Sequence, residues 1–286
     1  MKKIKAAWAL MKDCWRVLQL DRELLLFPLF SLLSCAVIFA VIASPMWFSG
    51  KIGATFDWLS DRPDSSMDPV VVAATFALYF IVYFVIIFFN SALIACAKIR
   101  FGGGDPTVSD GLRAARQRLP QILAWALVTS IVGFLLNFLS NNKNGRSNIV
   151  FGLLGAGWAI AAYFVVPVLV TENVGPYQAV KRSVAIIKKS WGEALVAEVG
   201  FSALGFVIVL PAMLTFMIAI SVFDFLPVLS ILLIAVIVLW VFTCALVLST
   251  LGSILKAALY LYATEGKIPS QFDASFVENA FHKAEG

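Results

Sequence analysis

Residues 175–194 read GPYQAVKRSVAIIKKSWGEA, and this stretch decides how the rest of the chain is interpreted. Val180, Val184, Ile187, Trp191 and Ala194 recur at steps of four, three, four and three, which places them on one face of an α-helix. Basic residues fill the flank and the opposite face, and a long apolar run follows. The segment therefore predicts an amphipathic helix that lies on a membrane surface and leads into a membrane span.

The same arrangement occurs twice more along the chain. The matching positions are Ile4, Trp8, Met11, Trp15 and Leu18 in one segment, and Val108, Leu112, Ala115, Leu119 and Ile122 in the other. Because each segment leads into a pair of apolar runs, the sequence predicts three pseudo-repeats, at residues 1–98, 99–170 and 171–263. Residues 264–286 then form a polar cytoplasmic tail.

Composition indicates a membrane protein. Of the 286 residues, 61% are hydrophobic and 14% charged, against about 45–50% and about 25% in soluble domains. Six apolar runs are long enough to cross a bilayer. They cover residues 24–48, 69–98, 120–140, 149–170, 194–222 and 228–263. We therefore expect an all-α, polytopic membrane domain with six transmembrane helices, each pair preceded by an interfacial amphipathic helix.

The distribution of charge predicts the orientation of the chain. The net charge is +5, and eighteen of the 22 Lys and Arg residues lie at one set of span ends. Such an excess marks the cytoplasmic side, so both termini are expected in the cytoplasm and the protein in a bacterial inner membrane. The expected partners of the basic residues are anionic lipid head groups, and nucleic acid is not expected.

Few residues in the chain are typical of catalysis or metal binding. The four cysteines are scattered, and the one histidine, His282, lies close to the carboxyl end. Gly102, Gly103 and Gly104 are not followed by the Lys-Ser/Thr of a phosphate loop, and they predict a helix end and a turn. Four aspartates at 57–68 do not have EF-hand spacing. We expect no enzyme activity, no metal and no cofactor.

Two segments resemble known families. They are Phe101-Gly102-Gly103-Gly104 through Trp125, and 167–172 (PVLVTE) through Trp191-Gly192-Glu193. In these segments the chain resembles uncharacterised bacterial six-span membrane proteins, loosely related to Yip1-like proteins and to the membrane domain of some glycerophosphodiester phosphodiesterases. The resemblance implies a membrane domain and transfers no catalytic residue, because the phosphodiesterase catalytic domain is absent.

Several residues stand out as candidates for function. Glu198 and Asn90 are polar residues within predicted spans; Glu198 faces either a solute path or the membrane interface, and Asn90 is suited to hydrogen bonding between helices. The candidate head-group contacts are Lys181, Arg182, Lys188, Lys189, Arg113 and Arg116. The candidate interfacial anchors are Trp8, Trp15, Trp125 and Trp191.

Three local features of the fourth span and its end predict structure. Pro167 predicts a kink. Small residues four apart, Gly152 with Ala156 and Gly157 with Ala161, permit close approach of a neighbouring helix. Glu172 is placed to pair with Lys181 or Arg182.

Two functions remain open at this point. The first is transport or pore formation for a small solute, ion or lipid, with Glu198 on the path. The alternative is a membrane-organising scaffold that binds anionic lipid and a cytoplasmic partner through its three basic helices. The first predicts a polar lumen, and an oligomer could supply one. The second predicts lipid binding that weakens with salt.

Overall fold

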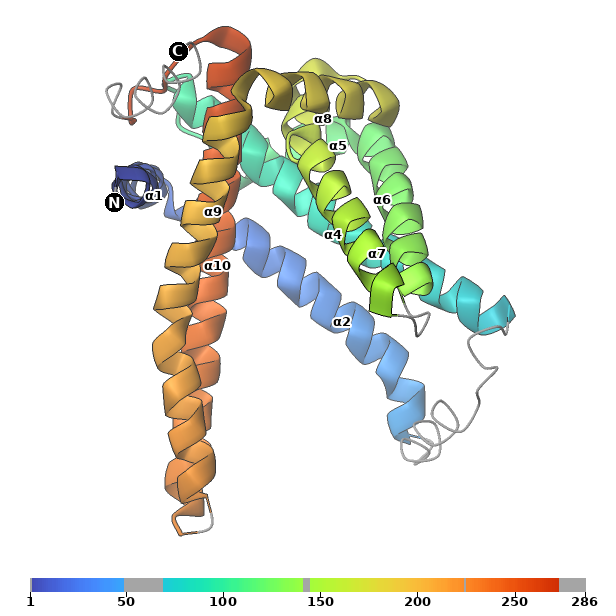
Figure 1. Ribbon diagram of the computed structural model, residues 1–286, viewed down its shortest axis with the longest axis vertical. Helices are drawn as coiled ribbons and strands as arrows, with labels where there is room; N and C mark the ends of the chain where they lie inside the picture. Colours follow the sequence, from blue (N-terminus) through green and yellow to red (C-terminus); the bar gives the residue numbers. More distant parts are fainter. Residues whose placement is uncertain (1, 49–68, 141–144, 224, 273–286) are drawn as a thin grey trace. The chain divides into compact units, whose positions relative to one another are not determined.

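The structure is a computed structural model that describes residues 2–48, 69–140, 145–223 and 225–272. Every element of this described part is helical, which confirms the predicted all-α class (Figure 1). In chain order the elements are α1 (Lys2–Leu20), the short 3-10 helix η1 (Arg22–Leu25), α2 (Leu26–Phe48), α4 (Pro69–Phe101), α5 (Val108–Gln117), α6 (Leu119–Ser140), α7 (Gly145–Ala162), α8 (Val165–Glu172), α9 (Pro176–Val222) and α10 (Pro227–Glu265).

Five helical segments are long and apolar enough to cross a membrane, which indicates a multi-pass membrane protein. They are Arg22–Ser44, Val72–Phe101, Leu119–Asn137, Gly152–Glu172 and Pro227–Glu265. The remaining predicted span, residues 194–222, lies within α9, where the apolar stretch found among the described residues is the shorter Val209–Ser221. The described residues therefore establish five candidate spans, and the sixth stays a prediction.

The chain divides into two compact units, each described here by itself. The first unit comprises Met1–Leu26, Cys96–Val108 and Ala185–Gly286, and the second comprises Phe27–Ala95 and Ser109–Val184. The boundaries of these units do not test the three predicted pseudo-repeats, which stay a prediction. The third basic segment does differ from the expected pattern, because it does not form a helix of its own. It is the start of α9, which continues for 47 residues without a break.

In the first unit, α9 and α10 form an antiparallel hairpin in which small residues hold the two helices together (Figure 1). Gly205, Ala212 and Ala219 recur every seven residues on α9. A Cβ atom on Gly205 would lie 3.2 Å from Cδ1 of Leu248, and the two alanines form a buried cluster with Ile237 of α10. A seven-residue repeat of small side chains lets two helices approach closely along their whole contact.

Helix α1 packs against α10 in the same unit. Its buried apolar side chains are Leu10, Met11, Cys14, Val17 and Leu18. Trp8 and Trp15, which the stepping placed on the same face as Met11, are 57% and 43% exposed. The apolar arc of α1 is wider than the strip that is buried, so the two indoles remain outside the packed contact.

The triple glycine ends α4, as the sequence predicts. The Gly104 N–H donates to the Ile99 carbonyl and the Gly103 N–H donates to the Arg100 carbonyl, both at 3.0 Å. Gly103 has φ of 84°, a left-handed conformation that residues with a Cβ atom rarely adopt. This pair of bonds is the Schellman motif of a helix C-terminus, and it leaves no phosphate loop here.

In the second unit, α6 packs against both α4 and α7. On the α4 side, a Cβ atom on Gly133 would lie 3.0 Å from the Tyr83 hydroxyl, so glycine permits a close approach. The Phe134 ring also meets the ring of Phe76 edge-on, with centroids 6.0 Å apart. These contacts fix α6 next to the aromatic face of α4.

On the α7 side, Trp125 of α6 stacks on Trp158 of α7, with ring centroids 5.5 Å apart and planes inclined by 26°. Trp125 is only 2% exposed. The interpretation of Trp125 as an interfacial anchor therefore needs correction, because its indole is buried between helices and does not reach the protein surface. The residue is a packing element of the second unit.

Candidate functional site

The fourth span is interrupted near its end, at the junction of α7 and α8. Helix α7 ends at Ala162 and α8 begins at Val165, so the break lies about one turn before Pro167. Proline has no N–H to offer the carbonyl four residues earlier, and its ring clashes with that carbonyl. The kink predicted from Pro167 is thus an interruption of the helix.

Ser183 of α9 supplies a hydrogen-bond acceptor at this interruption. The Phe164 N–H, which has no partner within α8, donates to Ser183 Oγ at 3.0 Å. Both residues are completely buried. An unpaired buried N–H would cost about 1–3 kcal/mol, so this hydroxyl stabilises the packing of the broken span against the start of α9.

A second polar contact secures the turn between α8 and α9. Asn173 ends α8 in the left-handed conformation, with φ of 52°, which asparagine tolerates better than most residues. Its side-chain oxygen accepts a 2.8 Å hydrogen bond from Nε2 of Gln121 at the start of α6. Pro176 then occupies the first position of α9, where its missing N–H is no loss. The entry of α9 is fixed by these contacts.

The first turns of α9 are amphipathic, as predicted, but of the described side chains on the predicted apolar face only Ile187 is buried, whereas Val180 and Val184 are partly buried. Ala179, Ser183, Ile186 and Ile187 are buried, whereas Lys181, Arg182 and Lys188 are exposed. Arg182 Nε lies 3.1 Å from Glu172 Oε1, so the predicted ion pair of Glu172 involves Arg182. The Arg182 side chain is 51% exposed, and a pair this accessible contributes little to stability.

Helix α5 repeats the arrangement in ten residues. Gly111 and Ala115 are buried, and Arg113 and Arg116 are exposed. We call Arg113 and Arg116 the α5 basic face, and Lys181, Arg182 and Lys188 the α9 basic face. Each helix thus buries its small and apolar side chains and presents cations outward.

The remaining predicted site residues have different outcomes. Trp8 and Trp15 are exposed and remain available as anchors. Asn90 of α4 is partly buried and is not free of partners. The side chains of Lys189, Trp191 and Glu198 lie outside the described residues, although all three positions fall within α9.

The first unit contains a charged cluster that the sequence patterns did not predict. Arg100 at the end of α4 forms ion pairs with Asp21, which precedes η1, and with Asp105. The Asp21 side chain is only 5% exposed, whereas that of Asp105 is 93% exposed. The sequence did contain a sign of this ion pair. Asp21 precedes the first apolar run and Arg100 follows the second, so both are predicted to lie on the same side of the membrane.

The same cluster binds the chain beyond α10. Arg16 donates to the Gln271 carbonyl at 3.2 Å, and Gln271 Nε2 donates to the Arg100 carbonyl at 3.5 Å. The Phe272 ring packs edge-on against Phe101, with centroids 5.9 Å apart. Three segments distant in sequence therefore meet at one place, and the contacts are structural in character.

Potential metal ligands are scattered among the residues that the structure describes. Within that part of the chain, no three His, Cys, Asp or Glu side chains are grouped to hold a metal ion. Burial raises the pKa of the Cys14 thiol, and the charge of Asp13 raises it further. A thiol that stays protonated is a poor nucleophile.

Comparison with known proteins identifies a family. A family model described as a family of unknown function (DUF6159) matches residues 70–270. No curated protein and no solved structure matched the chain. The match gives no support to a relationship with Yip1-like proteins or with the phosphodiesterase membrane domain, so that resemblance stays a prediction.

Proposed function

We propose a function for this chain, which belongs to the DUF6159 family of unknown function. It is a non-enzymatic membrane protein that binds anionic phospholipid through its basic helices. In this proposal the bound head groups hold the α5 and α9 basic faces at the cytoplasmic surface of the bacterial inner membrane. The protein then organises that surface and offers a cytoplasmic partner a place to dock. A homo-oligomer is compatible with this role.

The proposal rests on the α5 and α9 basic faces. Both lie on short amphipathic segments that buried contacts hold in place. The α5 basic face has two exposed arginines, and the α9 basic face adds exposed lysines beside the buried Ser183 contact. Cations close to an anionic membrane surface are each worth about 1 kcal/mol of attraction. Because these segments are fixed by buried contacts, little ordering would accompany binding.

The charge distribution supports the orientation that the proposal needs. Both basic faces lie at span ends that hold eighteen of the 22 Lys and Arg residues. Short loops rich in these residues stay in the cytoplasm. The inner leaflet there carries the anionic lipid that the basic faces would meet.

The test compares two four-residue neutralisations in reconstituted bilayers. One variant replaces Arg113, Arg116, Lys181 and Lys188 with Gln. Its matched control replaces the four cations of the predicted external loops, Lys51, Arg62, Lys143 and Arg146. Spin-labelled phosphatidylglycerol and phosphatidylcholine report how strongly each lipid is retained at the protein.

The unmodified protein should prefer phosphatidylglycerol, and salt should weaken the preference because it screens exposed charges. We expect the first variant to lose most of this preference and the control to keep it. Equal losses in the two variants, or a preference that salt leaves unchanged, would show that the basic faces do not select the lipid.

Transport is a second candidate, favoured by the interruption of the fourth span. Transporters commonly bind substrate where a membrane helix is broken. Flux of ions and small solutes through proteoliposomes tests this function, with Glu198→Gln and empty vesicles for comparison. Flux above that of empty vesicles and altered by the variant would support transport, with Glu198 on the path. Vesicles that stay tight over a broad panel would exclude it.

A further inference from the structure

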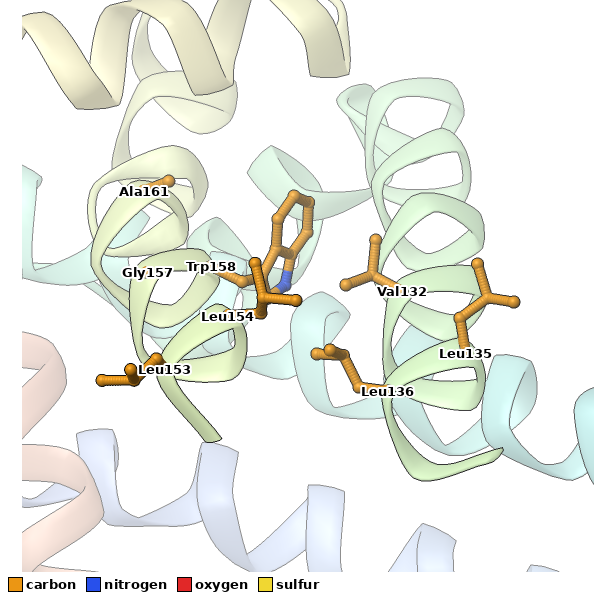
Figure 2. A pocket seen from close by; sticks show the side chains of 8 residues that line it. All are labelled: Val132, Leu135, Leu136, Leu153, Leu154, Gly157, Trp158 and Ala161. Atoms are coloured by element: carbon orange, nitrogen blue, oxygen red, sulfur yellow. The ribbon is translucent and has the colours of Figure 1, made fainter. Parts of the chain in front are cut away.

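A groove opens between α6 and α7 in the second unit (Figure 2). Its volume is about 540 Å³, within the range of small-molecule sites. Three side chains of α6 and five residues of α7 line it: Val132, Leu135, Leu136, Leu153, Leu154, Gly157, Trp158 and Ala161. None of them carries a charge or a hydroxyl, so the walls offer a ligand almost nothing except apolar contact.

The stacked indoles account for the groove. Trp125 and Trp158 fill the space between α6 and α7 at one level. Beyond that stack, Gly157 presents no side chain, and a Cβ atom added there would meet nothing within 4 Å. Leu154 and Trp158 of α7 and Val132 and Leu136 of α6 then face a common space (Figure 2). Large rings beside a small residue thus leave a hollow.

The position of the groove determines the medium that fills it. Its lining residues lie in the candidate spans Leu119–Asn137 and Gly152–Glu172, so the groove lies at the depth of the hydrocarbon core. The Trp158 indole N–H is the one polar side-chain group on these walls, so desolvating a polar solute there is costly. A single extended hydrocarbon chain matches these apolar walls.

The depth of the groove indicates which leaflet supplies the chain. At about 1.5 Å per residue, Val132 and Leu136 lie about 20 and 26 Å along α6 from Leu119. The hydrocarbon core is about 30 Å thick, and Leu119 follows directly after the α5 basic face. The groove therefore lies largely in the half of the membrane remote from that face.

We infer that this groove is a binding site for one acyl chain of a phospholipid from the leaflet remote from the α5 and α9 basic faces. The chain enters sideways from the bilayer and lies against the Trp158 indole and Gly157. The head group plays no part in this site, since the lining carries no charge and is almost entirely apolar. The site is thus independent of the anionic-lipid binding proposed above.

The experiment uses the full chain in bilayers that contain a phospholipid with a diazirine near the end of one acyl chain. Cyclodextrin exchange delivers the probe to one leaflet at a time, and peptide mass spectrometry locates the photolabel. Gly157→Leu fills the groove. Gly152→Leu is the matched control, because a Cβ atom at Gly152 also meets nothing within 4 Å and Gly152 does not line the groove.

We expect the label on peptides that contain Leu136 or Leu153 when the probe is in the remote leaflet. Gly157→Leu should reduce that label about tenfold, which corresponds to about 1.4 kcal/mol, and Gly152→Leu should leave it unchanged. Phosphatidylglycerol and phosphatidylcholine probes should label equally. Neutralising the basic faces should have no effect on the groove, so this test and the head-group test fail separately.

Three results would overturn the inference. The first is equal labelling of Gly157→Leu and the unmodified protein. The second is labelling from the leaflet that contacts the basic faces. The third is disulfide cross-linking of Gly157→Cys between two chains in the bilayer, which would show that a second copy covers the groove.

Discussion

At the scale of single residues, the Asp21–Arg100 pair is a buried contact that should be sensitive to change. A carboxylate that is 5% exposed needs its cation, because an uncompensated buried charge is costly. We expect Arg100→Gln to lower the free energy of unfolding by about 3 kcal/mol. Adding Asp21→Asn should recover part of the loss, since no buried charge then remains. Unfolding by SDS titration in mixed micelles measures both variants.

Asp105→Asn is the control for this prediction, because Asp105 binds the same arginine but is 93% exposed. It should cost less than about 1 kcal/mol, as exposed ion pairs do. If Asp105→Asn and Arg100→Gln were equally destabilising, burial of Asp21 would not be the cause.

At the scale of elements, the Ser183 hydroxyl is a buried contact between the start of α9 and the interruption before α8. Ser183→Ala leaves the Phe164 N–H buried without a partner, and we expect a loss of about 1–3 kcal/mol in the free energy of unfolding. Hydrogen exchange of the Phe164 amide should become faster in the same variant. Ser221→Ala is the comparison, since Ser221 is exposed and bonds only to Met217 of its own helix. Unchanged exchange at Phe164 would contradict the assigned contact.

The elements also show how far the sequence could lead. The apolar runs predicted the spans, Pro167 predicted the interruption, and the triple glycine predicted the end of α4, because each signal is local in the chain. The burial of Trp125 was not predictable. A tryptophan at a span end has the same local sequence whether it faces lipid or stacks on Trp158, and the difference depends on a residue of the next helix.

At the scale of the whole molecule, composition alone identified a multi-pass membrane protein. The candidate site was predictable only in part. The basic faces follow from helical periodicity, which is local. The Asp21–Arg100 contact joins residues 79 positions apart. The groove between α6 and α7 requires side chains of two helices, so no single segment of the sequence predicts either feature. The number of spans and the repeats remain predictions, since residues 189–204 of α9 have no described side chains.

The row of small residues in α9, Gly205, Ala212 and Ala219, has a consequence for insertion into the membrane. Because these residues let α9 and α10 close on each other, the two helices can enter the bilayer as one hairpin. The connection between them, residues 223–226, contains no Lys or Arg that would retain it in the cytoplasm. The predicted span at residues 194–222 is thus suited to insertion together with α10, without a separate orienting signal for each.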